Sequence, residues 1–143
     1  MLALTLIGTA FLACSSDDDD DDAKASVIAT YAGLYSVQEE GVTATVTAKV
    51  LFYSDKSYRL DLHCVGTSEG VAVSQEYSDE AGTYTGNPKA DGDVVLTKKY
   101  EFDESKNKLV ALSKDKWTTE TLTISNGKFT VEEDGEEVVF TKQ

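Results

Sequence analysis

The sequence predicts an all-β domain: a small up-and-down antiparallel β-barrel of about eight to ten strands, with a β-sandwich as the alternative. Apolar and polar residues alternate along most of the chain after Thr30, and turn sequences recur about every ten residues. A helical period is absent except for a turn expected near 26–32. A closed barrel is favoured because closure removes exposed strand edges.

Length and composition exclude several classes of protein. A chain of 143 residues suits one domain and is too short for a TIM barrel or a two-half dinucleotide fold. A net charge of −13 argues against a nucleic-acid partner, which needs clustered Lys and Arg. With one His and two Cys, the chain lacks the ligands of most metal sites, so we predict no metal and no cofactor.

The first residues have the pattern of a secretion signal. Residues 1–13 carry no charge and are mostly apolar, and this stretch is shorter than the roughly 20 residues that span a bilayer. Ala13 and Cys14 follow the apolar core, which resembles the lipobox of bacterial lipoproteins. The resemblance implies cleavage before Cys14 and lipidation of that residue. Cleavage elsewhere, with Cys14 an ordinary thiol, is the alternative.

An acidic run follows Cys14. Ser15 and Ser16 precede six aspartates, Asp17 to Asp22, which repel one another and are expected to stay extended. The run resembles the export signal of surface-exposed lipoproteins in the Bacteroidota. We therefore predict a tether over 14–28. Six of the 26 acidic residues lie in this run. The domain that follows therefore carries 20 acidic and 13 basic residues, a net charge that is ordinary for a small domain.

Two hairpin regions give specific strand registers. The loop Ser54–Lys56 predicts that the apolar faces of 42–52 and 58–64 coincide, because a slip of one residue would reverse one face. The predicted pairs are Phe52 with Tyr58, Val50 with Leu60, and Val46 with Cys64. Asn126-Gly127 and Asp134-Gly135 are strong turn signals. They predict a three-stranded meander with the pairs Ile124 and Phe129, Leu122 and Val131, Phe129 and Phe140, and Val131 and Val138.

Shorter strands are expected between these regions. The candidates are Gly33–Val37, Val71–Tyr77, Gly82–Gly86, Asp93–Phe102 and Leu109–Ser113. The order of Gly33-Leu34-Tyr35, Gly82-Thr83-Tyr84, Gly92–Leu96 and the closing 129–142 hairpin resembles small lipocalin-like domains of bacterial lipoproteins. That resemblance implies a barrel domain over 29–143. Tyr35 stands where lipocalins carry a Trp.

Few residues suggest chemistry. Gly66–Gly70 matches G-x-S-x-G, but it joins two predicted strands, whereas a nucleophile elbow joins a strand to a helix; we interpret it as a hairpin loop. Asp61 and His63 share a polar face, where a surface histidine is favoured over a metal ligand. Cys64 lies on the apolar face and is expected to be buried and inert, without a disulfide.

Two charged features remain open. Glu132, Glu133, Glu136 and Glu137 surround one turn with Asp134, and we prefer a solvated tip to a cation site. Lys98 interrupts an apolar face. Inside a barrel it would face a ligand carboxylate or sit at a wet mouth, and a bulge or a misplaced strand end explains it equally well. The tyrosines are expected to belong to the core or its rim.

These observations predict a non-catalytic, lipid-anchored outer-membrane lipoprotein exposed at the cell surface. Its barrel would bind a small apolar ligand or serve as a binding scaffold, since a small barrel is either filled or holds one small ligand. The alternative is an envelope structural or protein-interaction module, or an inhibitor of a secreted enzyme. A hollow barrel favours the ligand, and a filled one with an exposed apolar patch favours a protein partner. We expect no enzyme activity.

Overall fold

The computed structural model describes residues 25–133 and 135–143, and within them the chain is almost entirely β-strand. A single short 3-10 helix, η1, spans Lys114–Lys116 in this part of the chain. The strands are β1 (Val27–Glu39), β2 (Val42–Tyr53), β3 (Ser57–Ser68), β4 (Val71–Thr85), β5 (Gly92–Asp103), β6 (Lys108–Ala111), β7 (Thr118–Ile124), β8 (Lys128–Glu133) and β9 (Glu136–Lys142). The all-β prediction is confirmed.

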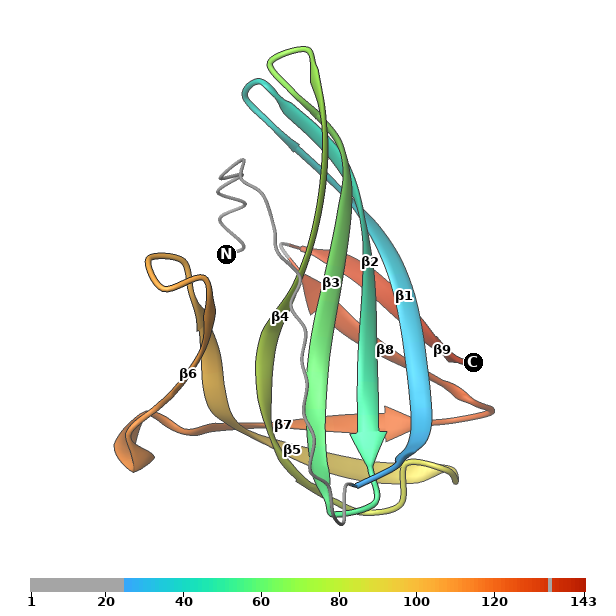
Figure 1. Cartoon of the computed structure of the whole chain (residues 1–143). Coiled ribbons are helices and arrows are strands. Elements are labelled where there is room, and N and C mark those ends of the chain that lie inside the picture. Colours follow the sequence, from blue (N-terminus) through green and yellow to red (C-terminus); the bar gives the residue numbers. More distant parts are fainter. Residues whose placement is uncertain (1–24, 134) are drawn as a thin grey trace.

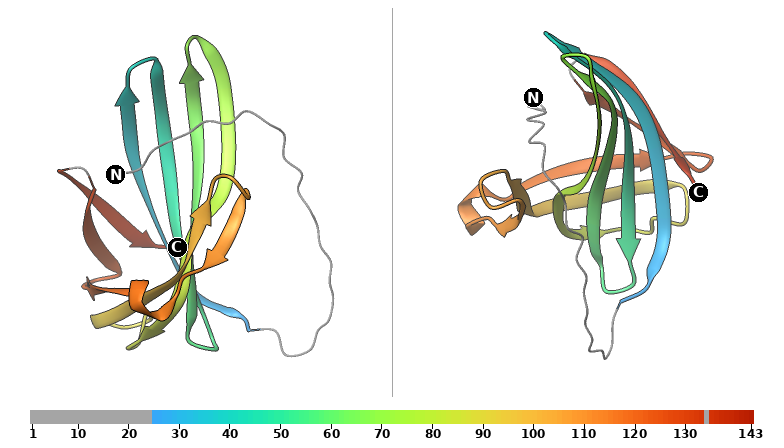
Figure 2. Two further views of the ribbon diagram at one scale, coloured as in Figure 1. Left: turned by 90° about the vertical axis from the view of Figure 1, so that its left-hand side faces the viewer. Right: turned by 45° about the horizontal axis from the view of Figure 1, so that its top comes forward.

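All nine strands belong to one antiparallel sheet (Figure 1). Its order is β6-β5-β4-β3-β2-β1-β9-β8, and β7 pairs separately with β5. The sheet curves strongly, and its two ends, β7 and β8, approach each other at the turn Asn126-Gly127 (Figure 2). A single bridge between Ser125 and Lys128 joins them there, so the sheet is not closed by a ladder of hydrogen bonds.

The central hairpin has the register that the alternation predicted. Phe52 faces Tyr58, Val50 faces Leu60, and Val46 faces Cys64. Lys56 adopts a φ of 72° in the connecting turn, and its backbone N–H donates to the Tyr53 carbonyl at 3.1 Å. The turn length and the apolar faces of both strands specify the same register, which is why the sequence predicted it correctly.

Two expectations about the first half were wrong. The turn expected near 26–32 is part of strand β1, where Ala29 and Tyr31 alternate into the core. Val71–Tyr77 and Gly82–Gly86 are not separate strands but lie along the single strand β4. Leu60 pairs with Glu80 and Asp61 pairs with Ser78, so Asp79 is an extra residue of β4 that forms a bulge. Because of this bulge, the polar segment around Asp79, whose sequence is typical of a turn, continues as strand.

A second bulge lies between β4 and β5. Ala81 pairs with Tyr100 and Gly82 with Lys98, which leaves Lys99 as the extra residue. A Cβ atom on Gly82 would collide with the backbone carbonyl of Thr97, so this position needs glycine for close approach of the strands. The bulge interpretation of Lys98 is therefore confirmed.

The C-terminal meander is only half as predicted. Phe129 pairs with Phe140 and Val131 with Val138 across β8 and β9, as expected. Asn126-Gly127 does reverse the chain, with positive φ at both residues. Beyond that turn, however, Ile124 and Leu122 pair with Gly92 and Val94 of β5 rather than with β8. The turn sequence specifies a local reversal, whereas the strand's partner depends on the curvature of the whole sheet.

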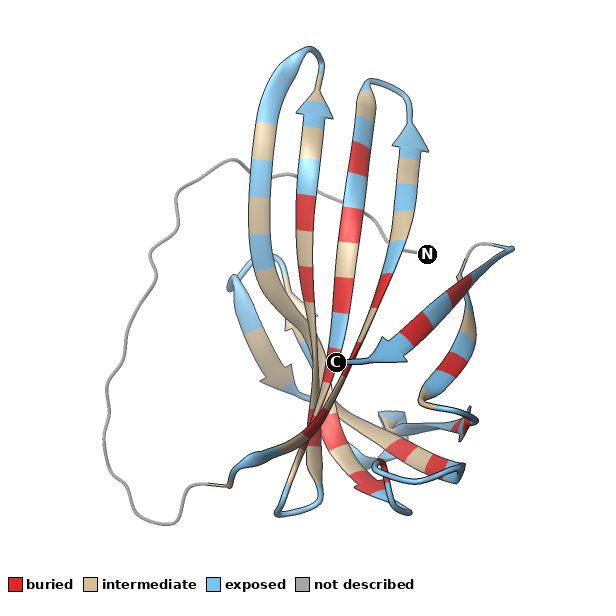
Figure 3. Ribbon diagram, turned by 90° about the vertical axis from the view of Figure 1, so that its right-hand side faces the viewer, coloured by how far each residue is buried: buried red, intermediate tan, exposed pale blue. Residues whose placement is uncertain are grey.

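Two regions of the sheet differ in what they pack against. We call the panel the part of the four-stranded sheet formed by 34–39, 42–47, 63–68 and 71–76, drawn uppermost in Figure 1. We call the remainder of the sheet the base. The base holds a buried aromatic cluster, whereas exposed and intermediate residues predominate toward the tips of the panel (Figure 3).

Candidate functional site

Buried aromatic side chains from several strands meet in the interior of the base. Tyr31 and Phe52 are fully buried, and their ring centroids lie 6.0 Å apart in an edge-on contact. Phe129 and Phe140 stack at 4.8 Å, and Tyr31 lies 5.1 Å from Phe129. The Tyr31 hydroxyl donates to the Pro88 carbonyl at 2.6 Å, which satisfies the buried oxygen and fixes the β4–β5 loop over the core. This end of the fold is a packed scaffold.

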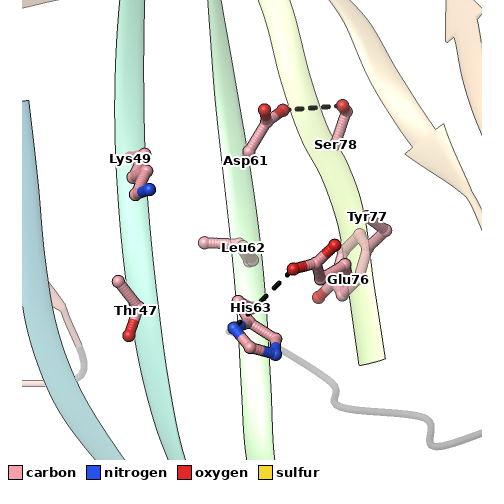
Figure 4. A pocket seen from close by; sticks show the side chains of 8 residues that line it. All are labelled: Thr47, Lys49, Asp61, Leu62, His63, Glu76, Tyr77 and Ser78. Carbon is pink, nitrogen blue, oxygen red and sulfur yellow. Dashed lines mark hydrogen bonds and ion pairs between the residues drawn. The ribbon is translucent and has the colours of Figure 1, made fainter. Parts of the chain in front are cut away.

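A polar hollow lies on the outer wall, at the boundary of panel and base (Figure 4). It has a volume of about 360 Å³. Its lining comes from three adjacent strands: Thr47, Lys49, Asp61, Leu62, His63, Glu76, Tyr77 and Ser78. The pairings of β3 with β2 and β4 place Lys49 and Ser78 on either side of Asp61, and Thr47 and Glu76 on either side of His63. Two rows of polar side chains thus cross the sheet.

The first row is held by Asp61. Arg59 donates to both carboxylate oxygens of Asp61, from Nε and from a terminal nitrogen, each at 2.7 Å. The Ser78 hydroxyl donates to the same carboxylate at 2.7 Å (Figure 4). The Asp61 hydrogen bond raises the pKa of Arg59 despite partial burial. A bidentate pair of this kind fixes both side chains and makes this row the rigid part of the hollow.

The second row is looser. His63 Nδ1 lies 3.8 Å from a Glu76 carboxylate oxygen, and its Nε2 lies 3.4 Å from the Ser74 hydroxyl. The side chain of His63 is 44% exposed and that of Glu76 is 75% exposed. Both can therefore move to meet a ligand without leaving a buried group unpaired.

The hollow combines hydrogen-bond donors and acceptors. Lys49 and His63 supply N–H donors, Glu76 is a carboxylate acceptor, the Thr47 hydroxyl can donate or accept, and the Ser78 hydroxyl, whose hydrogen is donated to Asp61, can accept. In the described ranges, no group of three or more His, Cys, Asp or Glu residues could hold a metal ion. The arrangement is suited to hydrogen bonding a small polar molecule.

The sequence identified part of this hollow. Asp61 and His63 share the outer face as predicted, and His63 is a surface histidine. The Asp61 carboxylate accepts hydrogen bonds from Arg59 and Ser78, and His63 lies beside Glu76 instead. Lys49, Glu76 and Ser78 were missed. Lys49 could have been found from the predicted register of β2 and β3, but the β4 residues depend on the bulge at Asp79.

The G-x-S-x-G motif forms a hairpin, as expected. Ser68 ends β3, and Glu69 and Gly70 make a two-residue turn with φ of 51° and 82°. Positive φ at both positions is the geometry of a type I′ hairpin turn, not of a strand-to-helix elbow.

Lys98 lies in a charged cluster on the base. Its ammonium group is 3.0 Å from Glu101, and the carboxylate of Glu80 accepts a 2.7 Å hydrogen bond from the buried Tyr58 hydroxyl. Burial lowers the pKa of Lys98, but the Glu101 hydrogen bond and nearby carboxylates more than offset this and leave the pKa raised. Burial and Glu80 together raise the pKa of Tyr58. The positive charge of Lys98 is therefore already matched within the protein.

The other residues singled out from the sequence are Cys64, the acidic turn around Asp134, and Cys14 with its acidic run. Cys64 is buried, as predicted, and burial raises the pKa of its thiol. Glu132 faces Glu137 and Glu133 faces Glu136 across β8 and β9, as the turn predicted, while Asp134 lies outside the described residues. Cys14 and the acidic run, Asp17 to Asp22, also lie outside them.

Comparison of the chain with protein-family models, curated proteins and solved structures found no match. None of the helical structure in the described residues is long and apolar enough to cross a membrane.

Proposed function

We propose that the chain is a lipid-anchored, non-catalytic binding module of the outer membrane, exposed at the cell surface. The support for the anchor is the sequence pattern of an apolar leader, Cys14 and the acidic run that follows it. The support for a binding role is the polar hollow, which offers both hydrogen-bond donors and acceptors beside the core of the base.

The hollow at Asp61 and His63 is the surface that we propose for ligand recognition. The observation that carries the proposal is its combination of one rigid row, fixed by Arg59 and Ser78, with one adjustable row at His63 and Glu76. Rigid groups bind without loss of side-chain freedom, and mobile ones adapt to the ligand. The ligand would be small and polar, with both donors and acceptors, such as a sugar or an amino acid.

An apolar ligand is the second candidate. Partly buried apolar side chains pack against the core cluster: Ile28, Tyr35, Val37, Leu60, Tyr77 and Val131. They supply the apolar surface on which the sequence-based proposal of a small apolar ligand rests.

Thermal shift of the full chain with Cys14→Ser distinguishes the two. The probes are a set of monosaccharides and free amino acids for the hollow, and a fluorescent fatty acid for the core. A polar probe should raise the Tm, and Ser78→Ala with His63→Ala should abolish that rise. The matched control Thr130→Ala, an exposed residue of β8, should preserve it. A rise with the fatty acid alone contradicts the hollow proposal, and no rise with any probe contradicts a small-ligand role.

The anchor is tested separately in a bacterial host with a lipoprotein export pathway. Radiolabelled palmitate should be incorporated into the wild-type protein and not into Cys14→Ser. Incorporation that persists in Cys14→Ser would overturn the proposed lipidation site.

A further inference from the structure

The panel ends in two strand edges that are open in the described structure. On one side, the pairing of β1 with β9 stops at Ala32, and on the other, the pairing of β4 with β5 starts at Glu80. From Val71 to Ser78, strand β4 pairs with β3 alone among the described strands. The tip of β4 extends away from β5 and β6 (Figure 1), and the last contact of its core face with β5 is the ring of Tyr77, whose centroid lies 4.7 Å from that of Phe102.

The open edge of β4 lacks the features that usually prevent strand pairing. Natural edges are protected by Lys, Pro, a bulge or a covering segment. Between Val71 and Ser78 there is no Lys and no Pro, and the β3–β4 register is continuous. Residues 71–75 are uncharged, and Val71 is 65% exposed on this edge. An edge of this composition favours addition of another strand.

We propose that a second copy of this chain pairs with this edge, β4 against β4 in antiparallel orientation. The pairing would join two panels into one eight-stranded sheet, β1-β2-β3-β4 followed by the same strands in reverse order. Such an interface is isologous, because each copy offers the same residues to the other. It does not depend on the proposed ligand or on the lipid anchor.

Side-chain faces restrict the register. Opposed residues must lie on the same face of the joint sheet, and a slip of one residue would place apolar side chains opposite polar ones. Tyr77 pairs with the buried Leu62 and therefore belongs to the core face, whereas Ser78 bonds to Asp61 on the outer wall. The two-fold axis must consequently pass through a residue and not between two residues.

Charge and chemistry then select one register. An axis at Glu76 would oppose two carboxylates, which is unfavourable. An axis at Gln75 would oppose Val71 with Asp79, at the bulge. An axis at Ser74 opposes Val71 with Tyr77 twice, an apolar and aromatic pair that stabilises sheets, and opposes Glu76 with Ala72. We therefore place the axis at Ser74.

The edge of β1 is the less favourable surface. Gly33 already lies against β9, since a Cβ atom there would approach the Val139 carbonyl to 3.0 Å. The open run on β1 begins only at Leu34, which makes it shorter than the one on β4. It nevertheless offers a matched control, because Ser36 is an exposed serine in the middle of that edge as Ser74 is on β4.

Cysteine cross-linking tests the axis directly. In the full chain with Cys14→Ser, oxidation of Ser74→Cys should give a disulfide-linked dimer, because residues opposed on an axis have Cβ atoms about 5 Å apart. Ser36→Cys should stay monomeric under the same oxidation, and the parent chain reports any contribution of the buried Cys64. Cross-linking through Ser36→Cys but not Ser74→Cys would overturn the proposal.

Sedimentation tests the interaction without cross-linking. At about 100 µM, a concentration chosen because a single strand pair is a small interface, the Cys14→Ser chain should contain dimer. Ser74→Lys opposes two ammonium groups on the axis and should weaken dimerisation at least about tenfold. Ser36→Lys should leave it unchanged. A monomeric parent chain, or an equal effect of both substitutions, would contradict the β4 interface; circular dichroism confirms that each variant is folded.

Discussion

The base and the panel share the four strands β1 to β4 but are stabilised differently. In the base, β1 to β4 meet further strands on both sides and enclose aromatic rings that contact one another. In the panel the same strands pair only among themselves within the described residues. Hydrophobic burial therefore stabilises the base and the part of the panel next to it, where Val46 and Cys64 are buried. Toward the exposed tips of the panel, backbone pairing contributes most, and substitutions there should cost less than in the base.

The largest difference is expected for core truncation. Phe52 is fully buried and its ring lies 5.0 Å from that of Tyr84. Phe52→Ala should lower the free energy of unfolding by about 3–5 kcal/mol, because the cavity adds to the lost transfer energy. Val73→Ala in the panel, at a half-exposed position, should cost below about 1 kcal/mol. Urea unfolding of both variants measures this, and equal costs would contradict the division into base and panel.

A smaller effect is expected from one buried hydroxyl. Tyr31→Phe removes the hydrogen bond to the Pro88 carbonyl and leaves that oxygen without this donor. The expected loss in the free energy of unfolding is about 1–3 kcal/mol. Tyr84→Phe is the matched control, since its hydroxyl bonds to the Tyr53 carbonyl in a less buried setting. A cost for Tyr84→Phe at or above that for Tyr31→Phe would show that the β4–β5 loop is not held by Tyr31.

The smallest effect concerns pH and the turn at the bottom of the base. The Ser57 hydroxyl and backbone N–H donate to Asp55 and lower its pKa from the ordinary value of 3.8. A lowered folded-state pKa gives stability that is complete above the ordinary pKa and lost as pH falls through the lowered one. Because Asp55 is exposed, the gain is at most about 0.5 kcal/mol.

Thermal melts between about pH 2 and pH 7 test this turn. The Tm of Asp55→Asn should lie below that of the parent at pH 7 and converge with it at the acid end. A constant difference across that range would mean that the Asp55 charge is not involved.

The sequence predicted those parts of the fold in which a turn and an alternating pattern agree. Phe52 and Tyr58 were paired correctly because the loop length and both apolar faces specify one register. The partner of Ile124 was predicted wrongly, because alternation shows which face a residue presents but not which strand lies beside it. Strand β4 was divided in two because Ser78 and Asp79 are typical turn residues, and a bulge absorbs them only in the context of β3.

The residues of the candidate site could likewise be predicted within one strand but not across the bulge. His63 and Asp61 were recognisable from one strand, since residues two apart share a face. Glu76 and Ser78 come from the strand whose register the bulge changes, so their places beside His63 and Asp61 could not be derived from the pattern.

The chain enters the described fold at the foot of β1, and the Glu40-Gly41 turn lies at the far end of that strand (Figure 1). A strand of 13 residues is about 40 Å long. Two copies joined through antiparallel β4 edges would point their feet in opposite directions. If both are anchored in a single bilayer and the joint sheet stands upright, the tether predicted over 14–28 of one copy must span the length of the sheet, which an extended chain of that length can do; if the sheet lies along the surface, both tethers can stay short.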